Sequence, residues 1–210
     1  IIRSSGDALL ALINDILDFS KVEAGKLELE TKTFYVRDLI ESSIDLVALG
    51  AHKKSLGIGY TVDASIPCSI DGDEARIRQV LLNFLSNAVK FTDSGRVSVH
   101  VGGASDTAGC GSGFDLKVSV RDTGMGIAKE KQALLFQSFQ QLQASINRKF
   151  GGTGLGLAIS KQLIELMGGT VAVESELGQG ATFSFRLPVV PGSLPSREFE
   201  LEQPFRPKGA

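Results

Sequence analysis

The sequence contains no tryptophan and only two cysteines and two histidines. Cys68 and Cys110 are too few for a disulfide framework and lack the spacing of metal ligands, so they indicate free thiols in a reducing compartment. His52 and His100 lie far apart along the chain. A metal centre or a catalytic triad built on histidine is therefore disfavoured.

Strong charge of one sign and long apolar runs are also missing. The net charge is −2, which gives no basic field for binding nucleic acid. No apolar run reaches the roughly 18 residues that a membrane span needs, and no signal peptide opens the chain. These absences predict a cytoplasmic location and no membrane or nucleic-acid partner for this part of the protein, although the full-length protein could be membrane-anchored.

The hydrophobic share of 42% in 210 residues is enough to build a core, in one large domain or two small ones. Residues 1–25 predict a long helix, because apolar residues recur at alternating steps of three and four. Such a seam is typical of a coiled coil or helical bundle, and an ordinary core helix is the alternative. Gly25 is the expected stop. Because Ile1 falls inside the helical pattern, we expect the chain to be part of a longer protein.

Residues 26–188 carry a mixture of strand and helix patterns. Strict alternation of apolar and polar residues predicts strands, and apolar residues at steps of three and four predict helices. The expected strands are 26–34, 56–62, 96–101, 114–121, 170–175 and 181–187, and 67–70 is expected to be a short connector or a strand. The expected helices are 36–54, 74–90, 129–136 and 155–167.

Turn and loop signals separate these elements. The run Asp71–Asp73 predicts a turn and a helix N-cap. Residues 102–113, rich in glycine, serine and alanine, predict a long mobile hairpin tip. Residues 137–150 have mixed periodicity and predict a mobile segment. Prolines and scattered charges after Pro188 predict a linker or tail over 189–210.

The chain is organised around a glycine-rich loop, Gly151–Gly156, that runs into a helix. Such a loop leaves unpaired N–H groups and the positive end of the helix dipole facing one point, which suits a phosphate. A flexible turn before a core helix is the alternative. The loop is not a P-loop, because no Gly-Lys-Ser/Thr follows, and no strand directly precedes it as a dinucleotide fingerprint requires.

Three polar residues share one face of the expected helix 74–90. Asn83, Asn87 and Lys90 are spaced i, i+4 and i+7. An Asn carbonyl is a suitable ligand for Mg²⁺, which keeps waters and phosphates as its other ligands, and a Lys ammonium can bind phosphate. A solvated helix face is the alternative interpretation.

A carboxylate stands where a strand ends in a glycine turn, Asp122–Ile127. A carboxylate at Asp122 would accept a hydrogen bond from the N6 amino group of adenine and would repel O6 of guanine, which favours ATP over GTP. Taken alone, this pattern is also that of a simple turn.

Taken in their order along the chain, these segments resemble the catalytic ATP-binding domain of sensor histidine kinases, which has the Bergerat ATP-binding fold. The resemblance covers roughly residues 1–188, and residues 9–29 are similar to the second helix of the dimerisation bundle in hybrid kinases. The matching boxes are the N box Asn83–Thr92, the first glycine box Asp122–Ile127, the F box Leu135–Phe139, the second glycine box Arg148–Leu157 and the third glycine box Gly178–Gly180.

The resemblance implies a set of binding roles. Asn87 would hold Mg²⁺ with Asn83 beside it, Lys90 and Arg148 would meet the phosphates, and Asp122 would bind adenine with Thr182 near it through water. The catalytic residues would be Asn83, Lys90 and Arg148. The remaining nucleotide contacts would be Phe91, Gly124, Gly126, Ile127, Gly152, Thr153, Gly154, Leu155, Gly156 and Leu157. Residues 129–152 would form an ATP lid.

The sequence also departs from the family pattern. No phosphoacceptor His followed by an acid is present, so the accepting histidine is expected on a first bundle helix outside this chain. Gln137 and Ser138 stand where an acid and a proline are frequent, and Asn147 stands where threonine is common. These differences concern the closing of the lid.

The resemblance therefore implies an α+β fold: a two-layer α/β sandwich with a mixed five-stranded sheet and three main helices. Residues 1–25 would belong to the bundle, 26–188 to the catalytic domain and 189–210 to a linker. The implied function is transfer of the ATP γ-phosphoryl group to a histidine, then to a receiver aspartate, in a homodimer. The alternatives are ATP hydrolysis, disfavoured because Asn83 replaces the glutamate base of gyrase-like and chaperone ATPases, and a silent module that only dimerises or senses nucleotide.

Overall fold

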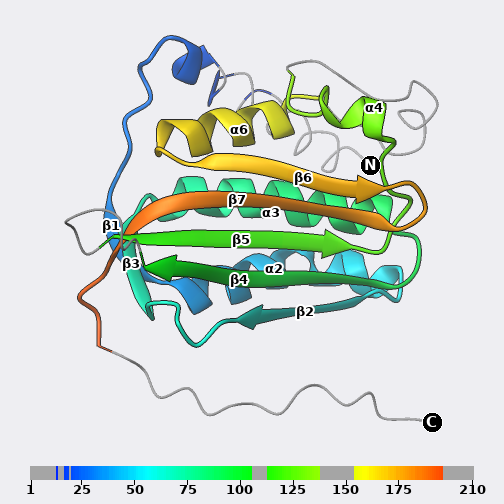
Figure 1. Cartoon of the computed structure of the whole chain (residues 1–210), viewed down its shortest axis with the longest axis horizontal. Coiled ribbons are helices and arrows are strands. Elements are labelled where there is room, and N and C mark those ends of the chain that lie inside the picture. The colour runs from blue at the N-terminus through cyan, green and yellow to red at the C-terminus, as the bar shows by residue number, and fades with distance from the viewer. Residues whose placement is uncertain (1–12, 14–16, 19, 106–112, 138–153, 196–210) are drawn as a thin grey trace.

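The computed structural model describes residues 13, 17–18, 20–105, 113–137 and 154–195 (Figure 1). The helices are α2 (Val36–Lys53), α3 (Glu74–Phe91), α4 (Lys129–Gln132) and α6 (Gly156–Leu166). The strands are β1 (Lys32–Tyr35), β2 (Gly57–Val62), β3 (Ser69–Gly72), β4 (Arg96–Ser105), β5 (Phe114–Asp122), β6 (Thr170–Glu176) and β7 (Gly180–Pro191).

The strands form one mixed sheet. Its order is β1-β3-β7-β5-β4-β2, and β6 pairs with β7 beside this path. Strands β2 and β4 run parallel, and the other neighbours run antiparallel. The sheet has seven strands. The expected number of five was too low, because the two short strands β1 and β3 pair with each other and with the far end of β7.

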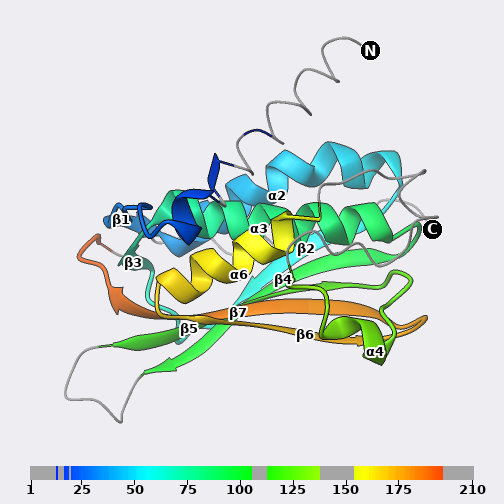
Figure 2. The same cartoon turned by 90° about the horizontal axis from the view of Figure 1, so that it is seen from above.

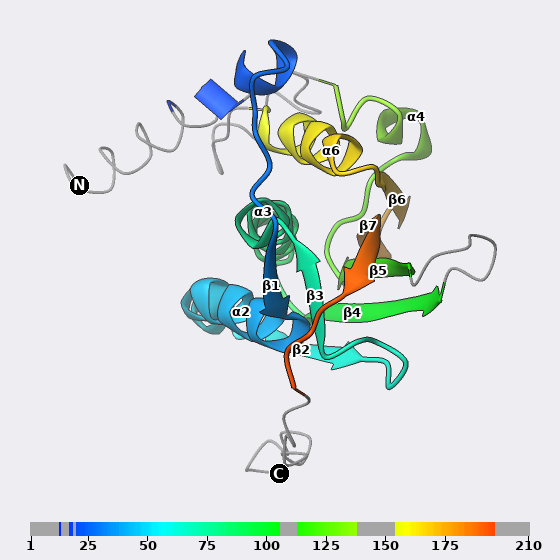
Figure 3. The same ribbon diagram turned by 90° about the vertical axis from the view of Figure 1, so that its left-hand side faces the viewer.

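Three longer helices, α2, α3 and α6, cover one face of the sheet (Figures 2 and 3). Helix α3 lies between the other two, and its buried side chains meet the inward face of the sheet. Phe84 packs against Phe183 and Phe185 of β7, with ring centroids 5.5 and 6.3 Å apart. The prediction of a two-layer sandwich with three main helices is confirmed.

Strand β5 contributes a row of apolar side chains to the core and ends in a carboxylate. Its inward-facing positions are apolar until the last one, where a carboxylate takes the place of a hydrocarbon side chain. These positions are Phe114, Leu116, Val118, Val120 and Asp122, all of them buried. The strand therefore delivers Asp122 to the edge of the core, below the end of α3.

Several predicted boundaries were wrong. Residues 26–31 form no strand, since only Lys32–Tyr35 find a partner in β3. Asp71 and Gly72 belong to β3 rather than to a turn, although Asp73 is the N-cap of α3 as expected. Strand β4 continues into the predicted hairpin tip, as far as Ser105.

Two further boundaries differ on the C-terminal side. Helix α4 ends at Gln132, four residues before the predicted end at Phe136. Strand β7 extends through Pro191, so residues 189–191 lie in the sheet and not in a linker. The predicted mobile segment falls almost wholly on residues 138–153, which lie outside the described residues.

The predicted N-terminal helix is described only near its end. Described residues up to Glu23 are helical, and Gly25 has a φ of +62°, which confirms it as the stop. Asp18 accepts hydrogen bonds from Arg76 (3.0 Å) and Gln79 (2.9 Å) of α3. The described end of the helix is thereby held against α3, and the expected bundle seam lies mostly outside the described residues. No described helix combines the length and apolar character that crossing a membrane requires.

Candidate functional site

The site is built around Asp122 at the end of β5. Asp122 is 5% exposed, and its Oδ1 accepts hydrogen bonds from the backbone N–H groups of Gly124 (2.8 Å) and Ala181 (3.3 Å). Burial raises the pKa of the Asp122 carboxyl, and these two hydrogen bonds oppose the rise. Within the described part of the chain, Oδ2 accepts no hydrogen bond. The buried carboxylate is thus held in one orientation, and its Oδ2 can accept a hydrogen bond from a ligand.

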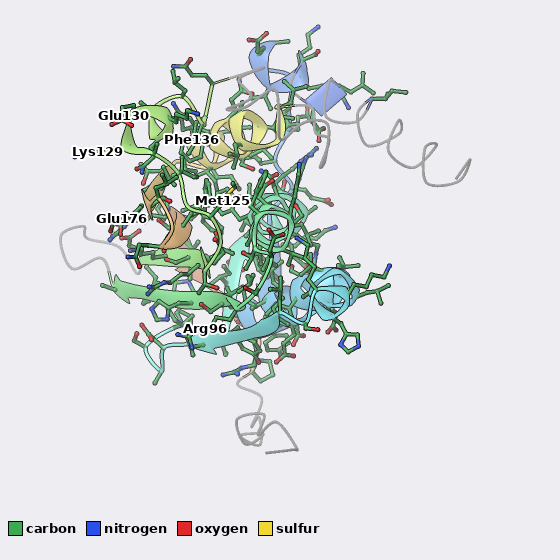
Figure 4. All side chains as sticks on the ribbon, turned by 90° about the vertical axis from the view of Figure 1, so that its right-hand side faces the viewer. Arg96, Met125, Lys129, Glu130, Phe136 and Glu176 are labelled. Carbon is green, nitrogen blue, oxygen red and sulfur yellow. The ribbon has the colours of Figure 1, made fainter. Side chains whose placement is uncertain are left out.

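The glycine turn that follows Asp122 packs tightly between two neighbouring segments. A Cβ at Gly124 would lie 2.4 Å from the carbonyl oxygen of Phe91, and one at Gly126 would lie 2.0 Å from that of Glu176. Gly126 also has a φ of +68°. Backbone contacts within the protein thus require both glycines. Figure 4 views this end of the molecule, with Met125 of the turn and Glu176 of β6 labelled.

A serine of β6 connects the glycine turn to the β6–β7 turn. Ser175 Oγ accepts a hydrogen bond from the N–H of Ile127 (2.8 Å) and donates one to the carbonyl of Gly180 (2.7 Å). Gln132 of α4 donates to the carbonyls of Ile127 (3.0 Å) and Ser175 (2.7 Å). The hydrogen bonds join the base of the predicted lid to the backbone that holds Asp122.

The predicted magnesium residue, Asn87, belongs to a chain of polar contacts along α3 and α6. Asn87 Nδ2 donates to Asn83 Oδ1 (3.2 Å), and Asn83 Nδ2 donates to Ser160 Oγ of α6 (2.8 Å). The Asn87 amide nitrogen is therefore engaged, and its carbonyl oxygen accepts no hydrogen bond from the described residues. A carbonyl oxygen presented in this way fits a hard cation such as Mg²⁺.

The described residues offer no metal site made of His, Cys, Asp and Glu side chains alone. In that part of the chain, no three His, Cys, Asp or Glu side chains group closely enough to hold a metal ion. A metal at Asn87 would take its other ligands from water and phosphate, as Mg²⁺ does in nucleotide sites.

Lys90 and Phe91 form the end of α3 beside the glycine turn. Lys90 Nζ lies 5.0 Å from the centre of the Phe91 ring, and burial lowers the pKa of the Lys90 ammonium. A phosphate beside the ammonium would oppose that shift, which suits this position to an anion. An open cleft of about 230 Å³ lies here, lined by Lys90, Phe91, Asp93, Ser94 and Thr123–Met125.

Helix α6 begins in the second glycine box and reaches the asparagine face. Gly154 has a φ of +71°, and Leu155, the N-cap position, is buried. A Cβ at Gly156 would lie 2.6 Å from Asn83 Oδ1, so only glycine allows α6 to approach α3 this closely. Leu157 packs against the core. Arg148, Gly152 and Thr153 lie outside the described residues.

The structure does not bring Thr182 to Asp122, contrary to expectation. Thr182 pairs with Arg121 of β5 and Glu174 of β6, and paired residues share a face of the sheet. That face points away from the helices, whereas Asp122 points toward them. The residue that faces Asp122 is Ala181, through its backbone N–H.

Residues 72–191, more than half of the chain, match the family described as histidine kinase-, DNA gyrase B-, and HSP90-like ATPase. Over 187 residues the chain is 45% identical to hybrid signal transduction histidine kinase B of Dictyostelium discoideum, covering 89% of this chain and 9% of that protein. It is 44% identical over 189 residues to sensor protein GacS of Pseudomonas syringae pv. syringae, covering 89% of this chain and 20% of that protein. The chain thus spans a fifth or less of the length of these relatives.

A solved structure agrees with these similarities. The chain superimposes on the crystal structure of full-length ShkA in complex with AMPPNP with a TM-score of 0.78 and 39% sequence identity. The match covers 93% of this chain and 39% of that one.

Proposed function

The chain belongs to the histidine kinase-, DNA gyrase B-, and HSP90-like ATPase family, and on that premise we propose that it is the ATP-binding catalytic part of a sensor histidine kinase. The observation that carries the proposal is the buried Asp122 carboxylate, held by two backbone N–H groups at the end of an apolar stripe. A carboxylate there would accept a hydrogen bond from the N6 amino group of adenine and would repel O6 of guanine.

Position 83 favours a kinase over the hydrolysing branch of the family. Its amide cannot take a proton from water, and it is bound to Ser160 and Asn87 rather than directed at a nucleophile. The Dictyostelium discoideum relative reported above is named a histidine kinase. We infer that hydrolysis is a minor reaction here.

Phosphoryl transfer depends mostly on positioning and on neutralising charge. In the proposed site, Asn87 would hold Mg²⁺, which supplies positive charge to the phosphates. Lys90, Arg148 and the N–H groups at the start of α6 would bind the phosphate oxygens. The glycines at 152 and 154 would let the backbone approach, and Phe91 would pack beside the nucleotide.

We further propose that this catalytic part acts with a phosphoacceptor helix, a receiver domain and a second copy of the protein. The phosphoryl group would pass to a histidine on the first bundle helix, and then to an aspartate of a receiver domain. The helix that ends at Gly25 would form a homodimer with its copy. A cytoplasmic location follows from the proposal, because ATP and the receiver are found there.

Calorimetric titration with Mg-ATP and with Mg-GTP tests the proposal. We expect binding of ATP in the micromolar to millimolar range and much weaker binding of GTP. Asp122→Asn should cost more than about 1 kcal/mol of ATP binding, because a charged acceptor is lost and an amide donor can face N6.

Asp115→Asn is the matched control for this substitution. It removes the same charge from the same strand, but Asp115 lies on the outer face, paired with Arg186. Equal ATP affinity in Asp122→Asn and the unchanged protein would rule out the adenine role.

A further inference from the structure

The end of α3 carries Lys90 and Phe91, and its last carbonyl groups need hydrogen-bond donors from outside the helix. Thr92 supplies two of them, because its N–H (3.1 Å) and its Oγ1 (2.7 Å) both donate to the carbonyl of Ala88. The next carbonyls along the chain are bound by a single side chain from another element, Lys54.

Lys54 follows α2 and reaches across to three carbonyl oxygens. Its Nζ donates to the carbonyls of Val89 (2.8 Å), Lys90 (2.8 Å) and Thr92 (2.9 Å). An ammonium group has three protons and no acceptor, so three carbonyls match its capacity. Its positive charge also lies at the negative end of the α3 dipole.

The backbone conformation that follows α2 orients the Lys54 side chain. Ser55 has a φ of +54°, a left-handed conformation that is uncommon for a residue other than glycine. The turn is closed by hydrogen bonds from the N–H of Ser55 to His52 (2.9 Å) and from that of Leu56 to Ala51 (3.0 Å). Leu56 is buried, which fixes the exit from α2.

We infer that Lys54 is a positioning residue for the nucleotide site, although it does not line the cleft beside Lys90 and Phe91. Lys54 binds the carbonyls of Val89 and Lys90 in the last turn of α3, and Gly124 packs against the carbonyl of Phe91. Without Lys54, the carbonyls of Val89 and Lys90 would turn toward water, and the side chains of Lys90 and Phe91 would move with them. The inference rests on the proposed function.

Lys54→Met and Lys53→Met form a matched pair for the test. Both remove one positive charge at the end of α2, but Lys53 is exposed and its removal leaves the three carbonyls bound. Titration with Mg-ATP well below the unfolding temperature should show at least a tenfold loss of affinity for Lys54→Met. The loss for Lys53→Met should stay within twofold. Equal affinity in Lys54→Met and the unchanged protein would overturn the inference.

A double-mutant cycle separates positioning from general destabilisation. If Lys54 acts through the end of α3, Lys90→Ala should cost less ATP affinity in the Lys54→Met background than in the unchanged protein. Losses that simply add would overturn the inference. Failure of the unchanged protein to bind ATP would instead overturn the proposed function itself, so the two results are distinct.

Lys54→Arg decides the matter if Lys54→Met does not fold. Arginine keeps the charge but cannot present three protons from one nitrogen, so the last turn of α3 should loosen. Faster hydrogen exchange at the Thr92 amide together with weaker ATP binding supports the inference. Faster exchange with unchanged ATP binding contradicts it.

Discussion

At the scale of single residues, the role proposed for Asn87 predicts that its effect on nucleotide binding depends on Mg²⁺. Its amide nitrogen is tied to Asn83, so its carbonyl oxygen is the atom that would meet the cation. Asn87→Ala should weaken binding of ATP with Mg²⁺ and leave binding of ADP in EDTA little changed. Titrations with and without the metal check this, with Ser86→Ala, an exposed neighbour on α3, as the control. Equal losses in both conditions would mean that Asn87 serves packing.

Asp122 also makes a prediction about pH and stability. Burial raises the pKa of its carboxyl in the folded protein, so between the ordinary value of 3.8 and the raised value the folded state binds more protons than the unfolded state. The contribution of Asp122 to the free energy of unfolding therefore falls as pH rises through this window. Asp122→Asn removes that dependence.

Urea denaturation from acidic to neutral pH measures this effect. The stability of Asp122→Asn relative to the unchanged protein should increase with pH and then level off above the folded-state pKa. A relative stability that stays constant across the range would contradict the burial argument. The Asp122 carboxylate, which is proposed to bind adenine, would thus lower the free energy of unfolding at neutral pH, as buried functional groups often do.

The sequence reveals some of these residues better than others. Asn87 could be placed because helical spacing puts it on one face with Asn83, and Asp122 because it ends an alternating strand. Thr182 was misplaced, since a shift of one residue along a strand moves a side chain to the opposite face. Ser175 and Lys54 gave no signal, because their partners are backbone atoms distant in sequence.

At the scale of elements, the start of α3 depends on one side chain. Asp73 Oδ1 accepts a hydrogen bond from the N–H of Arg76, and Oδ2 accepts one from the N–H of Glu30, each 3.0 Å long. Asp73→Ala should lower the free energy of unfolding by about 1–2 kcal/mol, because both N–H groups lose a charged acceptor.

Chemical denaturation of Asp73→Ala and Asp45→Ala provides the comparison. Asp45 is exposed on α2, so its loss should change stability by less than about 0.5 kcal/mol. Equal effects of the two substitutions would show that the cap does not hold α3.

Strand limits were harder to predict than the strands themselves, because pairing decides them. Residues 26–31 alternate like a strand, but the N–H of Glu30 is bound by Asp73 and not by a neighbouring strand. Strand β7 continues past Pro188 because that residue lies where β6 has ended and β3 has not begun. No N–H is needed on that edge, so proline is tolerated.

At the scale of the whole molecule, the sandwich and the preceding helix meet on α3. Asp18 contacts Arg76 and Gln79 on the same helix that carries Asn87 and Lys90. In the proposed kinase, this helix would link the nucleotide to the bundle that presents the accepting histidine. Joining donor and acceptor in one assembly raises the local concentration of the histidine, which speeds transfer.

Incubation with ATP labelled at the γ-phosphate distinguishes a histidine kinase from an ATPase in one experiment. The chain alone should gain no acid-labile phosphate, because His52 lies at the exposed end of α2 and His100 lies in β4. It should also release phosphate very slowly, since Asn83 cannot act as a base.

A polypeptide that adds the preceding bundle helix to the same chain should become labelled on its histidine, orders of magnitude faster than a separate helix mixed with the chain. Label on His52 or His100 would contradict the assignment of both to the sandwich. Steady release of phosphate without a labelled histidine would contradict the kinase account and favour the hydrolysing branch of the family.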